Sequence, residues 1–252
     1  MLRHFLIQSQ TPQLGARRLY QHVVNQIGLR VVRGDYASGD ILPGEEVLVA
    51  EFGVSRTVIR EAIKVLTEKG LVQPRTKVGT LIHPRNSWNW LDSDVLNWEI
   101  QAGQMHSLLR KVTEARRIIE PEVAALAAER GSDAEIAQIT GAYRRMEQNP
   151  DDLPEYIAAD MAFHAAIMDA CHNEMLAQMA DTMRRALIAS REVTLKLPGN
   201  SLKALPLHLA VVQTIQNRDS QGAFAAMQNL IGRAAYDIEM ALGEIERAQA
   251  NQ

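Results

Sequence analysis

The sequence predicts a mostly α-helical protein with an N-terminal winged helix-turn-helix and a C-terminal all-helical antiparallel bundle. Before residue 104, two short helical patterns separated by a glycine precede two short strand patterns. After it, alanine, leucine, methionine and charged residues dominate, as in helices. With 252 residues and 46% hydrophobic content, the chain is long enough for two hydrophobic cores.

The helix-turn-helix is predicted from apolar spacing and a glycine. Residues 46–52 form a short amphipathic pattern that ends at Gly53, the residue type best suited to a left-handed turn. Ser55 is a natural N-cap for a second helix, although Val58 follows three residues later where a full capping box has an acid. The apolar face of this second helix comprises Val54, Val58, Ile59, Ala62, Ile63, Val65 and Leu66.

Polar residues open this second helix. Arg56, Thr57 and Arg60 project from its exposed side, where a helix N-terminus attracts phosphate. Arginine donates to guanine O6 and N7 together. Two arginines alone would more often form a solvated helix face, but the preceding turn and cap favour a DNA-reading helix.

A basic hairpin is predicted next. Residues 71–74 and 80–82 have the pattern of two short strands, and residues 75–79 between them carry Arg75 and Lys77. This arrangement is typical of the wing of a winged helix.

The charge distribution supports a DNA-binding head. Residues 1–85 carry 12 Lys and Arg against 7 Asp and Glu, a net of +5, and residues 86–252 carry 15 against 23, a net of −8. A basic head suits a polyanion, whereas the acidic total argues against indiscriminate coating of nucleic acid.

Residues 14–85 resemble the DNA-binding domain of the GntR family in three blocks: Leu42-Pro43-x-Glu45, Val54-Ser55-Arg56-Thr57 and Gly70-Leu71-Val72. The resemblance implies that Ser55, Arg56, Thr57 and Arg60 contact bases or phosphates of a double-stranded operator. It also implies that the wing tip, with Arg75 and Lys77, enters the minor groove. Glu46 departs from the pattern, because some relatives carry a DNA-contacting arginine there.

Three domains are expected: a winged helix-turn-helix over 1–85, a connector over 86–104 and an effector-binding and dimerisation domain over 105–246. The connector gathers the three tryptophans, Trp88, Trp90 and Trp98. We expect these rings to close a small inter-domain core, a role compatible with transmitting a ligand signal.

Turn-forming residues divide the chain after residue 104 into about six helices. These breaks fall at 131–133, 149–154, 172–173, 197–200 and 217–220. The expected architecture is an antiparallel bundle.

One spacing within the bundle indicates a metal site. Asp160 and His164 lie at i and i+4 and leave the same helical face. His208, expected to open a later helix after Pro206, would supply a third ligand and leave positions open for a bound molecule. The alternative is an ordinary ion pair between Asp160 and His164.

Residues 105–243 resemble the helical effector domain of the FadR subfamily, through blocks at residues 114–121, 160–164, 172–173 and 226–229 together with His208. In metal-binding members, an Asp and three His hold a divalent ion beneath a carboxylate ligand. The resemblance therefore implies a divalent metal, expected to be zinc, on Asp160, His164 and His208.

The same resemblance implies three effector contacts. Arg116 matches an arginine that faces the ligand carboxylate, with a surface pair to Glu120 as its alternative. Asn229 is placed at the last histidine position, where its amide would bond to the ligand or to metal-bound water. Asn173 is the third expected contact.

The connector resembles that of sugar-acid regulators of this subfamily, which implies a hexonate effector such as galactonate or gluconate. The expected protein is a homodimeric, cytoplasmic repressor of sugar-acid catabolism. A regulator responsive to fatty-acyl or other carboxylates, and a metal-dependent enzyme, are the alternatives. The single cysteine, Cys171, excludes an internal disulfide, and no apolar run is long enough to span a bilayer.

Overall fold

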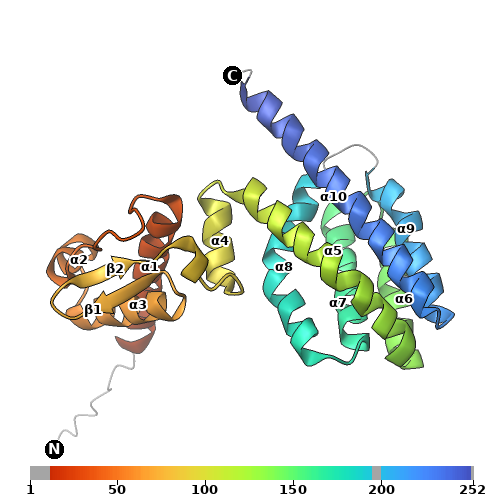
Figure 1. Ribbon diagram of the computed structural model, residues 1–252, viewed down its shortest axis with the longest axis horizontal. Coiled ribbons are helices and arrows are strands. Elements are labelled where there is room, and N and C mark those ends of the chain that lie inside the picture. Colours follow the sequence, from red (N-terminus) through yellow and green to blue (C-terminus); the bar gives the residue numbers. More distant parts are fainter. Residues whose placement is uncertain (1–11, 195–199, 251–252) are drawn as a thin grey trace, which may run out of the picture. The chain divides into compact units, whose positions relative to one another are not determined.

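The computed structural model describes residues 12–194 and 200–250, and it divides into two compact units, residues 1–103 and 104–252 (Figure 1). The first unit is a winged helix-turn-helix and the second is all-helical among its described residues, so the predicted fold class is confirmed. Each unit is described by itself.

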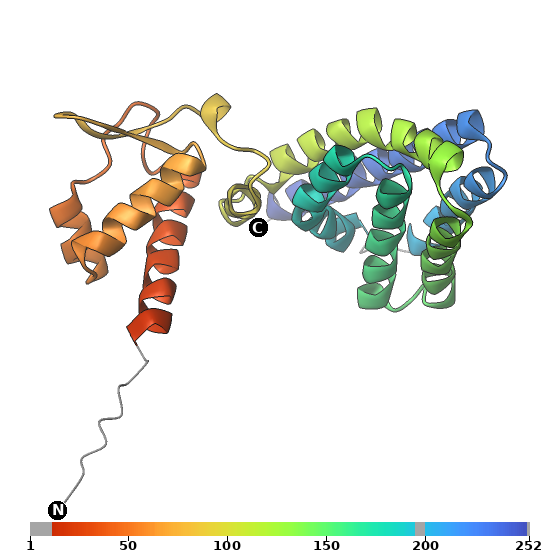
Figure 2. The same ribbon diagram turned by 90° about the horizontal axis from the view of Figure 1, so that it is seen from below.

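The first unit contains five α-helices or helical turns and one two-stranded sheet in its described part. Their bounds are α1 (Pro12–Arg33), α2 (Glu45–Phe52), α3 (Arg56–Glu68), β1 (Val72–Arg75), β2 (Gly79–Ile82), the 3-10 turn η1 (Arg85–Ser87) and α4 (Ser93–Gln101). α1 and α3 lie side by side, with the β1–β2 hairpin next to them (Figure 2). Their shared core includes Val23, Ile27, Leu48, Ile59 and Leu66.

The turn between α2 and α3 has the predicted geometry. Gly53 is left-handed, with φ of 62°, and its N–H donates to the carbonyl of Val49. The hydroxyl of Ser55 accepts from the backbone N–H of Val58 at 3.4 Å. The glycine turn and the serine cap together fix where the second helix begins.

The wing is an antiparallel hairpin in which Val72 pairs with Ile82 and Arg75 with Gly79. Its tip turns through Lys77, whose φ is 63°, and Gly79, whose φ is 120°. The backbone of β2 is also bridged at Leu81 to Ile41. The hairpin is therefore anchored at its base and exposes its basic tip.

The tryptophans belong to the core of the first unit and do not form a separate inter-domain core. Trp98 on α4 is 1% exposed, and its ring lies so close to Gly28 on α1 that a Cβ there would stand 2.5 Å from it. Trp88 is buried in the same cluster, and Trp90 packs on its edge. The segment expected as a connector thus completes the DNA-binding unit, since α4 packs on α1.

The second unit consists of six helices in its described part: α5 (Met105–Arg130), α6 (Asp133–Gln148), α7 (Leu153–Ala170), α8 (Glu174–Thr194), α9 (Asn200–Gln216) and α10 (Ser220–Ala250). Four predicted breaks fall between these helices. The fifth, at 197–200, lies almost wholly outside the described residues. α5 and α10 run in opposite directions and pack along each other.

The expectation that His208 opens a helix is wrong. α9 begins at Asn200 and continues through Pro206, so His208 lies within the helix. Proline removes one backbone donor, the one that would bond the carbonyl of Leu202 at the exposed start of α9. The lost bond lies in the first turn of α9, at the exposed residue Leu202.

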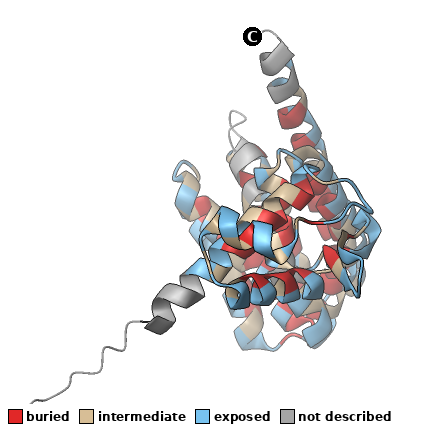
Figure 3. Ribbon diagram, turned by 90° about the vertical axis from the view of Figure 1, so that its left-hand side faces the viewer, coloured by how far each residue is buried: buried red, intermediate tan, exposed pale blue. Residues whose placement is uncertain are grey.

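Buried side chains of the second unit form one large cluster drawn from α5, α6, α7, α9 and α10, with Tyr143, Met146, Phe163, Ile215 and Met227 among its members. Partly buried residues of α8 pack against this cluster. Figure 3 shows buried positions, in red, alternating with exposed ones, in pale blue, along the helices. Among the described residues, no helix is both long and apolar enough to cross a membrane.

Candidate functional site

The opening of α3 presents the predicted DNA-reading residues together. Ser55, Arg56, Thr57 and Arg60 are all exposed. Arg75 and Lys77 are exposed at the wing tip, and Arg75 donates to Gln73 Oε1 at 3.1 Å. The structure therefore gathers the first four on the N-cap and first two turns of α3, and the last two on the hairpin.

The sequence interpretation did not foresee how acidic residues of α2 meet these arginines. Arg56 Nη2 donates to Glu46 Oε1 at 2.7 Å, and Arg60 Nε lies 3.0 Å from both carboxylate oxygens of Glu45. The hydrogen bonds that Arg60 donates to Glu45 raise the pKa of Arg60. The first turn of α2 lies 10 to 15 residues upstream, and only the fold brings it to α3.

The second unit brings the three predicted metal ligands together in its interior. Asp160, His164 and His208 are 1%, 6% and 2% exposed, and one ligand atom from each lies within 4.8 Å of the others. Asp160 Oδ1 is 3.1 Å from His208 Nε2 and 3.9 Å from His164 Nε2. Among the described residues this is the one such group that could hold a metal ion.

Partners behind each imidazole orient it for metal binding. His208 Nδ1 lies 2.9 Å from the carbonyl oxygen of Ala204, and His164 Nδ1 lies 2.9 Å from Glu120 Oε2. Because both oxygens only accept, the protons belong on Nδ1 and each Nε2 faces Asp160. The lone pair of His208 Nε2 then faces the negatively charged oxygen Asp160 Oδ1. A proton or a metal ion between these two atoms removes the repulsion.

Burial and charge set the protonation states around this group. Burial lowers the pKa of His164 in spite of Glu120, which favours the neutral imidazole that a metal requires. Burial alone would raise the pKa of Asp160, but the charge of Arg191 and the bond from His208 hold it well below its ordinary value. The donor set thus fits a divalent ion.

Arg116 is buried within the same cluster. Its guanidinium pairs with Glu120 as the sequence alternative suggested, but both residues are almost completely buried, so the pair is not a surface one. Arg116 Nη2 also lies 3.4 Å from His164 Nε2. Among the described residues its buried Nη1 has no hydrogen-bond partner, so this donor is available to an acceptor on a ligand.

Arg191 on α8 was not anticipated. Its Nε donates to Asp160 Oδ2 at 2.6 Å, and its Nη2 lies 3.4 Å from His164 Nε2. Since Arg191 takes Oδ2, the other oxygen of Asp160 stays directed at the two histidines. An isolated arginine in a helical pattern gave no signal that could have identified it.

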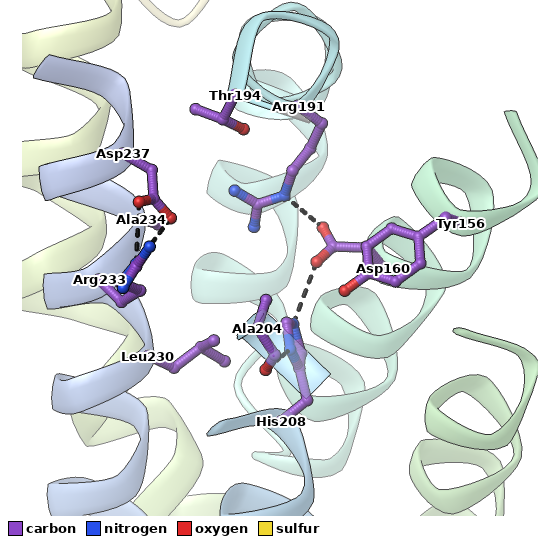
Figure 4. Close-up of a pocket in the computed structure, with 10 residues that line it drawn as sticks. All are labelled: Tyr156, Asp160, Arg191, Thr194, Ala204, His208, Leu230, Arg233, Ala234 and Asp237. Carbon is purple, nitrogen blue, oxygen red and sulfur yellow. Dashed lines mark hydrogen bonds and ion pairs between the residues drawn. The ribbon is translucent and has the colours of Figure 1, made fainter. Parts of the chain in front are cut away.

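A small cavity of about 30 Å³ opens beside Asp160 and His208. Figure 4 shows Arg191 reaching Asp160 from α8, while Arg233 on α10 pairs with Asp237. The lining comprises Tyr156, Asp160, Arg191, Thr194, Ala204, His208, Leu230, Arg233, Ala234 and Asp237. The cavity has room for about one water molecule, so a small-molecule effector can bind here only if the lining moves apart. The polar groups of the lining suit a charged, hydroxylated ligand.

None of the three predicted effector contacts lines this cavity, and Arg116 lies in the adjoining buried cluster. Asn229 is exposed, and its neighbour Leu230 occupies the lining position on α10. The Oδ1 of Asn173 accepts from the backbone N–H groups of Met175 and Leu176 at 3.2 and 3.3 Å, so Asn173 caps α8. Leu230 carries no ligand atom, which leaves three protein ligands in the described site.

Comparison with known proteins places both units in characterised families. Residues 19–82 match the model of bacterial regulatory proteins of the gntR family, and residues 111–233 match the FCD domain. The chain is 32% identical to the galactonate operon transcriptional repressor of Escherichia coli, over 83% of this chain and 92% of that one. It is also 32% identical to the E. coli HTH-type transcriptional regulator YieP, over 87% and 95%.

A solved structure of the Listeria monocytogenes regulator Lar, described as controlling the agr system, superposes with a TM-score of 0.58 at 17% identity. It covers 94% of this chain and 99% of Lar, and shows the common fold. These relatives are transcriptional regulators and not enzymes. The chain therefore belongs to the gntR family of bacterial regulatory proteins and is a DNA-binding transcriptional regulator with an FCD domain.

Proposed function

We propose that this regulator is a homodimeric repressor of genes for sugar-acid catabolism and that a hexonate releases it from its operator. The similarity to the galactonate operon repressor over most of both chains supports this assignment. So does the agreement between the exposed arginines of α3 and a DNA-reading helix. Its operator lies on the chromosome, so we place its action in the bacterial cytoplasm.

The observation that carries the proposal is the cavity of the second unit, whose two arginines are each paired with an aspartate of the lining. Arg191 and Arg233 line it, and the partnerless Nη1 of Arg116 lies in the adjoining buried cluster. Arginine forks recognise carboxylates through paired hydrogen bonds. The carboxylate of Asp237 accepts from Arg233 Nε and has further lone pairs for the hydroxyl groups of a ligand. An acyl chain would instead place apolar surface against these charges, so the lining favours a polyhydroxy acid.

We assign a divalent ion, most suitably zinc, to Asp160 Oδ1 and the Nε2 atoms of His164 and His208. When bound, the ion supplies a Lewis acid for an oxygen of the effector. Glu120 and the Ala204 carbonyl hold the protons of the two Nδ1 atoms, and Arg191 holds Asp160 Oδ2. These contacts keep three ligand atoms directed to one point.

The mechanism couples two sites through the dimer. Two copies present two winged helices to the halves of a pseudo-palindrome, with the recognition helices in successive major grooves. A hexonate favours an arrangement of the dimer in which the two heads no longer match the half-site spacing. Ligand binding in the second units therefore weakens DNA binding by the first units.

The experiment measures thermal stability of the full chain, first stripped with a chelator and then loaded with zinc. Galactonate, gluconate, glucuronate, lactate and an acyl-CoA are added in turn to the wild type, to His164→Ala and to the surface control Met175→Ala. We expect a hexonate at 100 times its Kd to stabilise the wild type and the control by about 2.7 kcal/mol, and to leave His164→Ala unchanged. Metal analysis should give one ion per wild-type chain and loss of that ion in His164→Ala.

Stabilisation by acyl-CoA alone would contradict the sugar-acid assignment. Equal hexonate responses of wild type and His164→Ala would contradict the metal-anchored site. A sedimentation measurement that found only monomers with and without operator would contradict the dimeric mechanism.

A further inference from the structure

The exposed ion pair between Glu46 and Arg56 lies on the DNA-reading face. The two side chains are 82% and 62% exposed, and 2.7 Å separates Arg56 Nη2 from Glu46 Oε1. Pairs this exposed contribute little to folding stability. A carboxylate on this face also repels DNA phosphates. A hydrogen-bond donor on the DNA would offset this repulsion in the complex.

The major groove offers such a partner at cytosine. The amino group on cytosine N4 donates to glutamate or aspartate, and guanine presents the two acceptors N7 and O6 beside it. A G·C pair therefore displays acceptor, acceptor and donor in a row. An A·T pair displays acceptor, donor and acceptor, which is a different order.

The Arg56–Glu46 pair can display the complementary row. The bond between them uses Nη2 and Oε1, while the guanidinium has further N–H groups and the carboxylate has a second oxygen. Arg56 then supplies two donors and Glu46 one acceptor. We propose that this pair reads one G·C base pair in each half-site, with Arg56 on guanine O6 and N7 and Glu46 on cytosine N4.

Glu45 differs from Glu46 in a way that sets their roles apart. Both carboxylate oxygens of Glu45 lie 3.0 Å from Arg60 Nε, and the Glu45 side chain is only 36% exposed. Glu45 therefore positions Arg60, whereas Glu46 adds an acceptor to the reading surface. This assignment rests on DNA binding itself and not on the identity of the effector.

The test uses the full-length chain and an operator selected from a randomised duplex library. Each cytosine of the half-site is replaced in turn by 2-pyrimidinone, which lacks the 4-amino group, and affinity is measured by fluorescence anisotropy at constant salt. At one position the wild type should lose roughly tenfold in affinity, within the range of one lost base contact. Glu46→Ala should bind the matched and modified duplexes almost equally.

Glu51→Ala is the matched control, because Glu51 lies on the same helix but pairs with Arg30 on α1. It should keep the wild-type sensitivity, and Glu46→Gln, which retains an acceptor, should keep part of it. If Glu46→Ala raises affinity for every duplex by the same factor and remains sensitive to the missing amino group, the proposal is wrong. Glu46 would then act only as a repulsive charge.

Discussion

Glu120 illustrates how a single buried residue supports the site in the second unit. Its carboxylate lies between Arg116 and His164. Burial alone would raise its pKa, but the charges of Arg116 and His164 lower it below its ordinary value. Its ionised form therefore contributes stability above the unfolded pKa of about 4.3, and this contribution is lost as the pH falls through the lower folded pKa.

Replacing Glu120 by glutamine should strongly destabilise the second unit, because Arg116 would remain buried without its counter-charge. Breaking one partner of a buried pair typically lowers the free energy of unfolding by about 3 kcal/mol or more. Urea unfolding at pH 7, followed by far-ultraviolet circular dichroism, measures the change. The double variant Arg116→Met, Glu120→Leu should recover part of the loss, and an unchanged midpoint in the single variant would exclude this role.

Individual site residues differed in how far the sequence could predict them. Asp160 and His164 share a helical face by spacing alone, so local geometry predicted their proximity. Asn229 and Leu230 differ by one position, which turns a side chain by about 100° around a helix and moves it out of the cavity. Arg191 reaches Asp160 from another helix, a contact that depends on tertiary packing.

At the scale of elements, the contact between α1 and α4 depends on a missing side chain. A Cβ at Gly28 would stand 2.5 Å from the Trp98 ring, so Gly28→Ala should force the two helices apart. We expect a loss of roughly 1 to 3 kcal/mol in the first unit, measured by urea unfolding. Gly44→Ala is the control, since no heavy atom lies within 4 Å of its added Cβ; similar losses in both would contradict the packing argument.

The start of α6 offers a pH-dependent test. Hydrogen bonds from Ser132, together with one from His172, lower the pKa of Glu135 to about 2. A lowered carboxyl pKa stabilises the fold above the unfolded value of about 4.3 and ceases to do so as the pH falls towards 2. Glu135→Gln should therefore lower the thermal midpoint at pH 7, with the difference from wild type shrinking below pH 4.

Ser132→Ala provides the comparison for that measurement. The Ser132 hydroxyl accepts from the backbone N–H of Glu135 whatever the charge of the carboxyl, and losing such a cap lowers stability by about 1 kcal/mol. Part of the stability lost in Ser132→Ala should therefore still be lost at low pH. If the difference in thermal midpoint between Glu135→Gln and the wild type did not vary with pH, the ionised form of Glu135 would not be what stabilises the start of α6.

For the whole molecule, the proposed release mechanism requires reciprocal coupling. If a hexonate weakens operator binding by a factor between about 5 and 150, the operator must weaken hexonate binding by the same factor. Calorimetric titration of hexonate into the metal-loaded dimer, alone and saturated with operator duplex, measures this. Equal affinities in the two titrations would remove the basis for ligand-induced release.

Local signals explain why so much of the architecture was predictable from the sequence. Gly53 and Ser55 define the turn through their own backbone and side-chain chemistry, and four of the turn-rich breaks after residue 104 coincide with helix ends. Local signals did not predict which part of the chain the tryptophan segment packs against. Its packing on α1 depends on residues some 70 positions earlier, and no local pattern encodes that partner.

The burial of the tryptophans also provides an optical probe. Trp88, Trp90 and Trp98 are the three tryptophans of the chain, and all belong to the first unit. Intrinsic tryptophan emission therefore reports on the DNA-binding unit alone, whereas the candidate effector cavity lies in the other unit. A change of emission on adding an effector would record the signal arriving at the DNA-binding unit, in an unlabelled protein and without DNA.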